Sequence, residues 1–399
     1  MKIDRIDIRE IFDSRGESTI EITVTNDRGE SASAQVPSGK SRGKNEVEVL
    51  LFPKAREVFE GTIRKIVEKK TFNAIQVMDQ TLLTGDGTPR KEKFGGNVML
   101  GLSVAFAKLL AFERKQPLWK TIEDAFFESG APVTPPLIFS NFVNGGAHAA
   151  NTLDIQEYLV VASPQKTTTE TIRGLVSLYK DFADLLRATY NVRAIPVGDE
   201  EGYSLDFKNN FEPLELLEKL ITKKKLSSSF SLALDVAATG FLKKGKYRFD
   251  GKEYDAEGML GVYKEYKKKS KLLMSIEDPF GEEDMDGFRM IGKSLKNVWI
   301  LGDDFTTTSS TRIEKYAREG LITAAIIKPN QIGTITESAE AMHSARSAGA
   351  KCIVSHRSGE TEDPFIMHLA RAGRAEGVKI GAPLNERIVK YNELVRIYD

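Results

Sequence analysis

The sequence is poor in cysteine and histidine: of its 399 residues only Cys352 is a cysteine, and four are histidines. A single cysteine excludes an intrachain disulfide, and it cannot by itself supply the thiolates of a structural zinc site. The sequence also lacks an apolar run of about 20 residues. Its first residues, MKIDRIDIREIFDSRG, alternate apolar and charged side chains and contain no signal-peptide core. We therefore expect a cytoplasmic protein without a membrane-spanning segment.

The chain has no excess charge of either sign, since 57 lysines and arginines balance 57 aspartates and glutamates. A neutral chain has no net attraction for nucleic-acid phosphates or anionic lipid, and we expect neither as a partner. Hydrophobic residues make up 41% and charged residues 29% of the chain, which is typical of a folded globular protein. The length predicts two domains, or one barrel-sized domain with an attachment.

The first 130 residues predict a small α+β domain. Residues 3–36 alternate apolar and polar side chains, with a turn at residues 26–29, as antiparallel strands do. From about residue 45 to residue 128 the apolar positions recur at spacings of three and four, for example at Phe59, Ile63 and Ile66. That period is typical of amphipathic helices packed on a sheet.

A proline-rich segment, SGAPVTPP at residues 129–136, interrupts this pattern. We place the domain boundary there, between domains at 1–130 and 135–399, because these residues extend neither a helix nor a strand. Beyond it, short apolar segments such as SLALDVAA and AKCIVSH alternate with amphipathic ones. This alternation predicts a parallel sheet, and the length suits a (β/α)₈ barrel. A doubly wound sheet is the alternative, disfavoured because no glycine-rich dinucleotide turn follows a strand.

Titratable residues follow six of the apolar strand candidates, at Asp235, Glu277, Asp303, Lys328, His356 and Lys379. Their spacings are close to the length of one βα unit, so in a barrel they fall at the C-terminal ends of the strands, where barrel enzymes carry their chemistry. A single acid after a strand is often the N-cap of the next helix. Helix capping does not explain the whole set, because it does not require two lysines interleaved with three carboxylates.

The three carboxylates Asp235, Glu277 and Asp303 predict a metal site. An all-oxygen donor set favours Mg²⁺. The alternative is that these acids form buried ion pairs with Lys328 and Lys379, which is costly unless a cation is also present. A lysine beside a divalent cation has a lowered pKa and becomes a usable base. The combination predicts proton abstraction next to a carboxylate, with the metal stabilising the enediolate.

Motifs along essentially the whole chain resemble those of the enolase family. They include VPSG, NGGAHA at 144–149, IQEY at 155–158, VGDE at 197–200, SIEDPF, IKPNQIGT, VSHRSGETED at 354–363 and KIGAP at 379–383. The resemblance implies an α/β barrel of the enolase kind, which begins ββαα with one antiparallel strand, behind a smaller N-terminal α+β domain. The short link between PLIFSNFVN and DIQEYLVVA agrees with this, because parallel strands need a longer crossover.

The resemblance also implies roles for individual residues. Lys328 would take the C2 proton of 2-phosphoglycerate, and Glu200, with Glu157 beside it, would protonate the leaving 3-hydroxyl. Two Mg²⁺ ions are implied, with ligands Asp235, Glu277 and Asp303 for the first and Ser41 for the second. The implied substrate ligands are Arg357, Ser358, His356 and His148 around the phosphate, Lys379 at the carboxylate, and Gln156.

The chain departs from the family in the loops expected to cover the site. Family members usually read PSGAST and VGDEGG, whereas this chain reads PSGKSRG at 37–43 and VGDEEG at 197–202. Lys40 and Arg42 therefore flank Ser41, Glu201 replaces a glycine, and Asn45 stands where the family has histidine. We expect the two basic side chains to attract the substrate phosphate when the loop closes, unless they point into solvent. These changes affect affinity or substrate identity more than proton transfer.

Together these features predict a phosphopyruvate hydratase of glycolysis and gluconeogenesis, and by resemblance a homo-oligomer. Two alternatives stay open. A paralogue acting on a different hydroxy acid would account for the altered loop. A catalytically inactive relative serving as a binding or scaffold module is disfavoured, because all the matched metal, acid, base and phosphate residues are retained.

Overall fold

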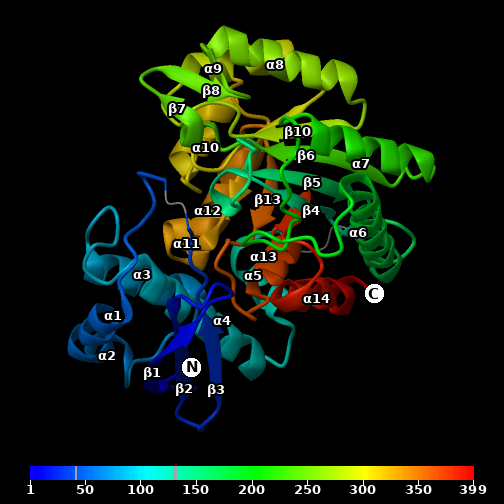
Figure 1. The fold of residues 1–399 in the computed structure, drawn as a ribbon. Coiled ribbons are helices and arrows are strands. Elements are labelled where there is room, and N and C mark those ends of the chain that lie inside the picture. Colours follow the sequence, from blue (N-terminus) through cyan, green and yellow to red (C-terminus); the bar gives the residue numbers. More distant parts are fainter. Residues whose placement is uncertain (41–42, 129–132) are drawn as a thin grey trace.

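The computed structural model describes residues 1–40, 43–128 and 133–399. It shows a small N-terminal domain, drawn in blue, below a barrel whose strands lie among the helices of the rest of the chain (Figure 1). Residues 129–132, at the predicted domain boundary, lie outside the described residues, as do Ser41 and Arg42.

The N-terminal domain consists of an antiparallel sheet and a set of helices. Its strands, in their order across the sheet, are β1 (Ile3–Phe12), β2 (Ser18–Asn26) and β3 (Ser31–Gln35). Its helices are α1 (Phe52–Val58), a π-helical turn η1 (Phe59–Ile63), α2 (Arg64–Val67), α3 (Ile75–Asp86), α4 (Gly96–Glu113) and α5 (Leu118–Phe126). The predicted α+β composition of this region is confirmed.

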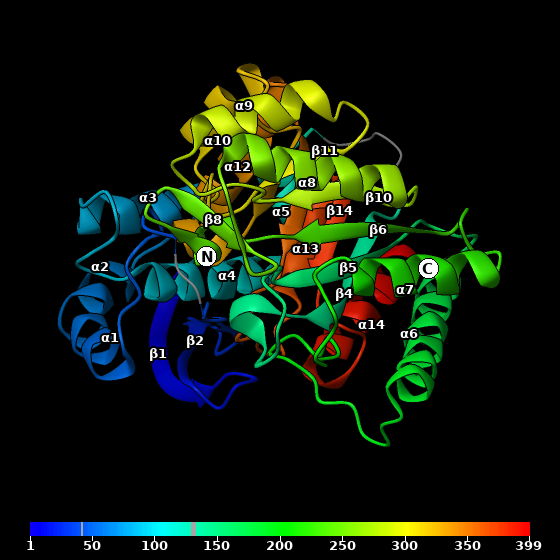
Figure 2. The ribbon, with the colours of Figure 1, turned by 45° about the horizontal axis from the view of Figure 1, so that its top comes forward.

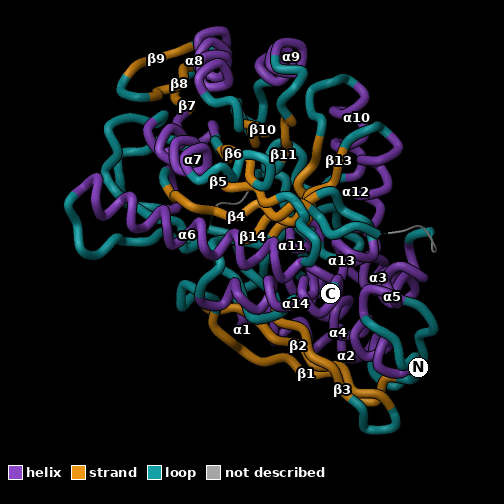
Figure 3. The backbone as a smooth tube through the Cα atoms, turned by 90° about the vertical axis from the view of Figure 1, so that its right-hand side faces the viewer, coloured by secondary structure: helices purple, strands orange, loops and turns teal. Residues whose placement is uncertain are grey.

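The rest of the chain forms a closed barrel of eight strands, which Figure 3 shows gathered at the centre of the surrounding helices. The barrel strands are β4 (Leu137–Asn144), β5 (Glu157–Ala162), β6 (Phe230–Asp235), β10 (Leu273–Glu277), β11 (Trp299–Gly302), β12 (Ala324–Ile327), β13 (Lys351–Ser355) and β14 (Gly377–Ile380). The α-helices are α6 (Thr168–Tyr190), α7 (Glu212–Lys223), α8 (Ala256–Lys269), α9 (Met285–Ser294), α10 (Ser310–Arg318), α11 (Pro329–Ile332), α12 (Ile335–Ser347), α13 (Phe365–Ala372) and α14 (Ile388–Tyr398). The 3₁₀ turns are η2 (Gly146–His148), η3 (Ala238–Phe241) and η4 (Asn385–Arg387), and a small separate sheet contains β7 (Leu242–Lys243), β8 (Lys246–Phe249) and β9 (Lys252–Tyr254).

The barrel is not an even repeat of βα units. Strand β5 runs antiparallel to both of its neighbours, β4 and β6, whereas the other described pairs in the barrel are parallel. Helices α6 and α7 follow β5 before the chain enters β6. The ββαα start expected from the resemblance is therefore confirmed. The β4–β5 connection contains only the three-residue turn η2 and no α-helix, so it lacks the helical crossover that usually joins parallel strands.

Helix α4 is apolar on all sides because it is a core helix. Its 18 residues have a mean hydropathy of 1.3, which is enough by length and composition to cross a membrane, although the sequence analysis identified no such run. In the structure 83% of this helix is buried. It packs on β2 and β3 and also contacts α11 and α12, so that it joins the N-terminal sheet to the barrel (Figure 2). Burial on all sides accounts for its composition.

The N-terminal domain also contacts the barrel at the C-terminal ends of the strands. The segment after β3 pairs with the loop after β13: the Ser38 amide donates to the Gly359 carbonyl at 2.7 Å, and the Gly359 amide donates to Ser38 at 2.9 Å. These bonds hold residues 37–40 over the barrel end where the titratable residues were predicted.

Candidate active site

The C-terminal ends of the strands bring the predicted residues together around one cavity. Asp235 ends β6 and Glu277 ends β10, while Asp303, Lys328 and His356 each follow the last residue of a strand. The predicted residues that line the cavity are His148, Gln156, Glu157, Glu200, Asp235, Asp303, Lys328, His356, Arg357, Ser358 and Lys379. Glu277 is connected to these residues by its ion pair with Lys379. The role of Ser41 stays a prediction, because this residue lies outside the described part of the chain.

Lys379 lies between the acidic residues of the site. Its Nζ is 2.8 Å from Asp235 Oδ2, 2.9 Å from both carboxylate oxygens of Glu277 and 3.3 Å from Glu157 Oε2. Although burial favours the neutral amine, these carboxylates hold the pKa of Lys379 well above its ordinary value. Burial and the neighbouring Asp235 in turn raise the pKa of Glu277.

Lys328 is held by Asp303. Its ammonium contacts Asp303 Oδ2, while Gln331 Nε2 donates to the other oxygen of Asp303 at 3.0 Å. The Lys328 amide donates to the Thr308 hydroxyl at 2.9 Å, which fixes the backbone at this position. Burial favours the neutral amine, but the Asp303 carboxylate outweighs it and raises the pKa of Lys328. This is opposite to the lowered pKa expected beside a divalent cation, because here the carboxylate faces the ammonium directly.

The ion pairs considered as the alternative to a metal site are therefore present in this structure. The chemistry of the cavity still fits divalent cations. Six carboxylic acids and three cationic side chains line it, so acids outnumber cations in a buried volume, where an uncompensated carboxylate is costly. Asp235, Glu277 and Asp303 are the oxygen donors that Mg²⁺ prefers. Rearrangement of Lys328 and Lys379 would free these three carboxylates to bind a metal ion.

The described residues contain a more compact group of ligand atoms elsewhere in the same cavity. Atoms of His148, Glu157 and Glu200 all lie within 4.8 Å of one another. The His148 Nδ1 atom is 3.6 Å from Glu157 and 3.7 Å from Glu200, and His356 Nε2 is 3.2 Å from Glu200. The two histidines predicted around the phosphate thus lie against the predicted acid.

The pKa values of Glu157 and Glu200 are shifted in opposite directions. Burial and the negative charge of Glu200 raise the pKa of Glu157 well above its ordinary value. Burial acts on Glu200 in the same direction, but His356 and His148 outweigh it, and the pKa of Glu200 is lowered. Neighbouring carboxyl groups whose pKa values are pushed apart hold one proton between them. The opposite directions of the two pKa shifts favour Glu157 over Glu200 as the protonated member.

Arg357 connects the barrel to the N-terminal domain. Its guanidinium donates to Glu46 Oε2 at 3.0 Å and to Asn330 Oδ1 at 2.9 Å, and all three side chains are buried. A side chain at Gly39 would collide with this guanidinium and would have to displace it, so glycine there suits the present position of Arg357. The Lys40 amide donates to Ser358 Oγ at 3.0 Å.

The altered loop does not present Lys40 to the phosphate site in this structure. The Lys40 ammonium pairs with Asp199 Oδ2 at 2.7 Å, and its side chain is 45% exposed. An ion pair this exposed contributes at most about 1 kcal/mol. Asn45 is exposed, and Arg42 lies outside the described residues, so its predicted attraction for phosphate stays a prediction.

Sequence reasoning missed several residues that complete the site. Asp278 accepts the amides of Asp303 and Asp304 at 3.0 and 2.7 Å, which orders the end of β11. Burial and the adjacent Asp303 raise the pKa of Asp304 to about 7. Asp278 and Asp304 could have been found from the sequence, because each directly follows a predicted ligand, in the motifs SIEDPF and GDD. Glu46 carried no such signal, since it does not follow a barrel strand, whereas Gln331 lies shortly after β12 in the motif IKPNQIGT and was not singled out.

Glu201 occupies the left-handed region with φ +64°, where glycine is favoured and a Cβ is strained. This explains the glycine that the family usually has there. Glu201→Gly should increase the free energy of unfolding by about 1 kcal/mol, seen as a higher thermal midpoint. Glu201→Ala is the matched control, because it removes the carboxylate but keeps the Cβ. Equal midpoints for the glycine and alanine variants would contradict the strain.

Comparison with known families assigns the two parts of the chain separately. Residues 3–122 match the family described as "Enolase, N-terminal domain", and residues 132–399 match "Enolase, C-terminal TIM barrel domain". The barrel match alone covers more than half of the chain.

Curated relatives named "Enolase" are similar over nearly their whole length. The protein from Elusimicrobium minutum is 37% identical over 407 residues, which cover 99% of this chain and 95% of the relative. The protein from Methanopyrus kandleri is 37% identical over 414 residues, with coverages of 99% and 95%. The protein from Thermococcus gammatolerans is 38% identical over 412 residues, with coverages of 99% and 94%. The chain therefore belongs to the enolase family, the carbon–oxygen lyases that interconvert 2-phosphoglycerate with phosphoenolpyruvate and water.

Proposed function

We propose that the chain carries out this dehydration with Lys328 as the base at C2 and with the Glu157–Glu200 pair as the acid at the 3-hydroxyl. The observation that carries the assignment is their placement in the barrel. Lys328 follows β12 and Glu157 begins β5, and these strands are four apart in either direction around the ring of eight. Base and acid therefore approach a substrate in the cavity from opposite sides.

The reaction needs only two proton transfers by these side chains. Lys328 first accepts the C2 proton, and the electron pair of the C2–H bond is delocalised onto the substrate carboxylate as an enediolate. In a second step that pair forms the C2–C3 double bond, the C3–O bond breaks, and the leaving hydroxyl departs as water with a proton from the acid pair. Because the pKa shifts favour Glu157 as the protonated member of the pair, the proton must cross to Glu200 for Glu200 to act as the donor that the resemblance implies.

The other side chains bind and orient the substrate. We assign Arg357 to the substrate phosphate, because a guanidinium fork can bond two phosphate oxygens at once, and Ser358 to the same end. We assign Lys379 to the substrate carboxylate and Gln156 to the same end of the cavity, where its Nε2 lies 3.4 Å from Asp235 Oδ2. Mg²⁺ bound by Asp235, Glu277 and Asp303 would neutralise the acids that hold the two lysines and would stabilise the negative charge on the substrate carboxylate.

The test is conversion of 2-phosphoglycerate by the purified protein with Mg²⁺, followed as the increase in absorbance of the enol product. Product formation that requires Mg²⁺ is expected. No conversion of 2-phosphoglycerate, together with turnover of another hydroxy acid, would instead support the paralogue that the altered loop suggested.

Asp303→Asn should weaken Mg²⁺ binding, so that activity falls at low Mg²⁺ and is partly restored by excess metal. The amide removes one of three acidic donors and also the carboxylate that contacts Lys328. Mg²⁺ titration of activity, with metal binding followed by calorimetry, measures the effect. Asp286→Asn, in an exposed ion pair with Arg289, is the control. An unchanged Mg²⁺ dependence in Asp303→Asn would place the metal elsewhere.

We further propose a cytoplasmic homo-oligomer that holds two Mg²⁺ ions per site, as family members do. Sedimentation of the purified protein and a count of bound Mg²⁺ in the presence of substrate test the last two statements.

A further inference from the structure

Arg387 is the largest fully buried side chain in the described part of the protein, at 0% exposure. It lies in η4, between β14 and α14. An arginine is rarely buried completely unless its donors are satisfied, because an unpaired buried charge is very costly. The partners of Arg387 therefore indicate what it does.

These partners belong to three separate segments. Nη2 donates to the carbonyl of Ser358 at 2.7 Å and to the carbonyl of Asp199 at 3.1 Å, and it lies 3.5 Å from the carbonyl of Arg357. Nη1 donates to the Ser14 hydroxyl at 3.0 Å and contacts the carboxylate of Glu386. One guanidinium thus joins residues 197–202, residues 356–361 and the turn between β1 and β2.

Each of these segments carries part of the proposed site. Asp199 directly precedes Glu200, and the segment after β13 supplies Arg357 and Ser358 for the phosphate. Ser14 belongs to the N-terminal domain, and its hydroxyl also accepts the Glu360 amide at 3.0 Å. The distance between the acid and the phosphate ligands therefore depends on the carbonyls that Arg387 bonds.

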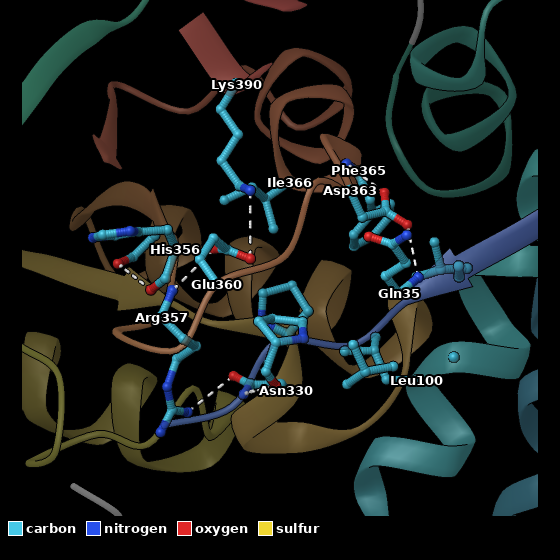
Figure 4. Close-up of a pocket in the computed structure, with 17 residues that line it drawn as sticks. Gln35, Leu100, Asn330, His356, Arg357, Glu360, Asp363, Phe365, Ile366 and Lys390 are labelled. Atoms are coloured by element: carbon cyan, nitrogen blue, oxygen red, sulfur yellow. Dashed lines mark hydrogen bonds and ion pairs between the residues drawn. The ribbon is translucent and has the colours of Figure 1, made fainter. Parts of the chain in front are cut away.

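A second buried cation holds only the phosphate side. Lys390 in α14 donates to the carbonyl of Thr361 at 2.9 Å, and its Nζ is 3.4 Å from Glu360 Oε1 (Figure 4). Glu360 in turn accepts the Arg357 amide at 3.3 Å. Of these two buried cations, only Arg387 has bonds to both segments among the described residues. It adds to the direct contact between them, in which His356 Nε2 lies 3.2 Å from Glu200.

We infer that Arg387 is a positioning residue that holds the segment of the acid Glu200 in register with the phosphate-binding segment. This inference rests on the proposed function. The fork geometry of a guanidinium matters here, because two carbonyls from different segments are bonded through one nitrogen while the other nitrogen reaches the N-terminal domain. A lysine ammonium is a single point donor on a flexible stem and cannot reproduce that arrangement.

Arg387→Lys tests the inference, since it keeps the charge but removes the fork. We expect the KM for 2-phosphoglycerate to rise about tenfold and dehydration to slow about tenfold. Exchange of the C2 hydrogen with solvent deuterium at saturating substrate should change less than twofold, because Lys328 is not bonded to either segment. A merely structural role would lower exchange and dehydration together.

Arg346→Lys is the matched control. Arg346 also bonds backbone carbonyls, those of Gly373 and Arg374, but these precede β14 and lie at the opposite end of the barrel. The kinetic constants of the Arg346→Lys variant should equal those of the wild type. Wild-type kinetics in a folded Arg387→Lys variant, or failure of that variant to fold, would overturn the inference.

A failure of the proposed function is distinguishable from a failure of the inference. If the wild type does not convert 2-phosphoglycerate, the proposed function is wrong, and the coupling is then measured by amide hydrogen exchange without substrate. Faster exchange in both 197–202 and 356–361 of Arg387→Lys, but not of Arg346→Lys, supports the bridge. Faster exchange in neither segment overturns it.

Discussion

Lys328→Ala should lower turnover of 2-phosphoglycerate by about 10²- to 10⁴-fold, the range typical of a lost general base. The variant should also lose exchange of the C2 hydrogen with solvent, because no other described amine except Lys379 lines the cavity, and Lys379 is held by Asp235 and Glu277. Proton exchange measured in D₂O separates this step from dehydration.

Lys351→Ala provides a comparison for this variant. Lys351 begins β13, at the end of the barrel away from the cavity, and packs over the ring of Trp299. Its removal should leave both exchange and turnover at wild-type values. Near-normal C2 exchange in Lys328→Ala would reject Lys328 as the base, whatever happens to the overall rate.

Glu200→Gln should give the complementary phenotype. The amide keeps the size of the side chain but cannot deliver a proton to the leaving hydroxyl, so dehydration should fall by about 10²- to 10⁴-fold. Abstraction at C2 does not need this group, and C2 exchange should persist. Comparable losses of exchange and dehydration would mean that Glu200 does not act on the leaving group.

Glu157→Gln tests whether the proton is shared. If the pair holds one proton, and burial places it on Glu157, the amide removes the source of that proton. Dehydration should then fall in Glu157→Gln as in Glu200→Gln, again with C2 exchange retained. Wild-type dehydration in Glu157→Gln would show that Glu200 alone supplies the proton.

The difference between Glu157 and Glu200 that these two variants test comes from the tertiary structure. The motifs VGDE and IQEY identify two acids, but they do not say which one is protonated. That difference follows from burial and from the histidines beside Glu200, which reach it from η2 and from the end of β13. Environments of this kind form only when separate segments meet.

The positions of the strand-end residues were predictable from the sequence because the signal is local. Each of Asp235, Glu277 and Asp303 lies at the end of an apolar segment, and successive parallel strands in a barrel end on the same side. The signals in the N-terminal domain are equally local: apolar and polar residues alternate along its strands, and apolar residues recur at spacings of three and four along its helices. The antiparallel start of the barrel needed one more observation, the short connection before β5.

What the chain sequence determined by itself is thus the barrel, its small N-terminal domain, the family and the set of reactive side chains at one barrel end. Only the tertiary structure decided how these side chains are paired. Arg357 bonds Glu46 across 311 residues and Arg387 bonds Ser14 across 373 residues. Patterns of period two or 3.6 report which face of an element is buried, but they carry no information about which distant segment covers it. The ion pair of Lys328, the opposite pKa shifts of Glu157 and Glu200, and the role proposed for Arg387 all depend on such contacts between distant segments.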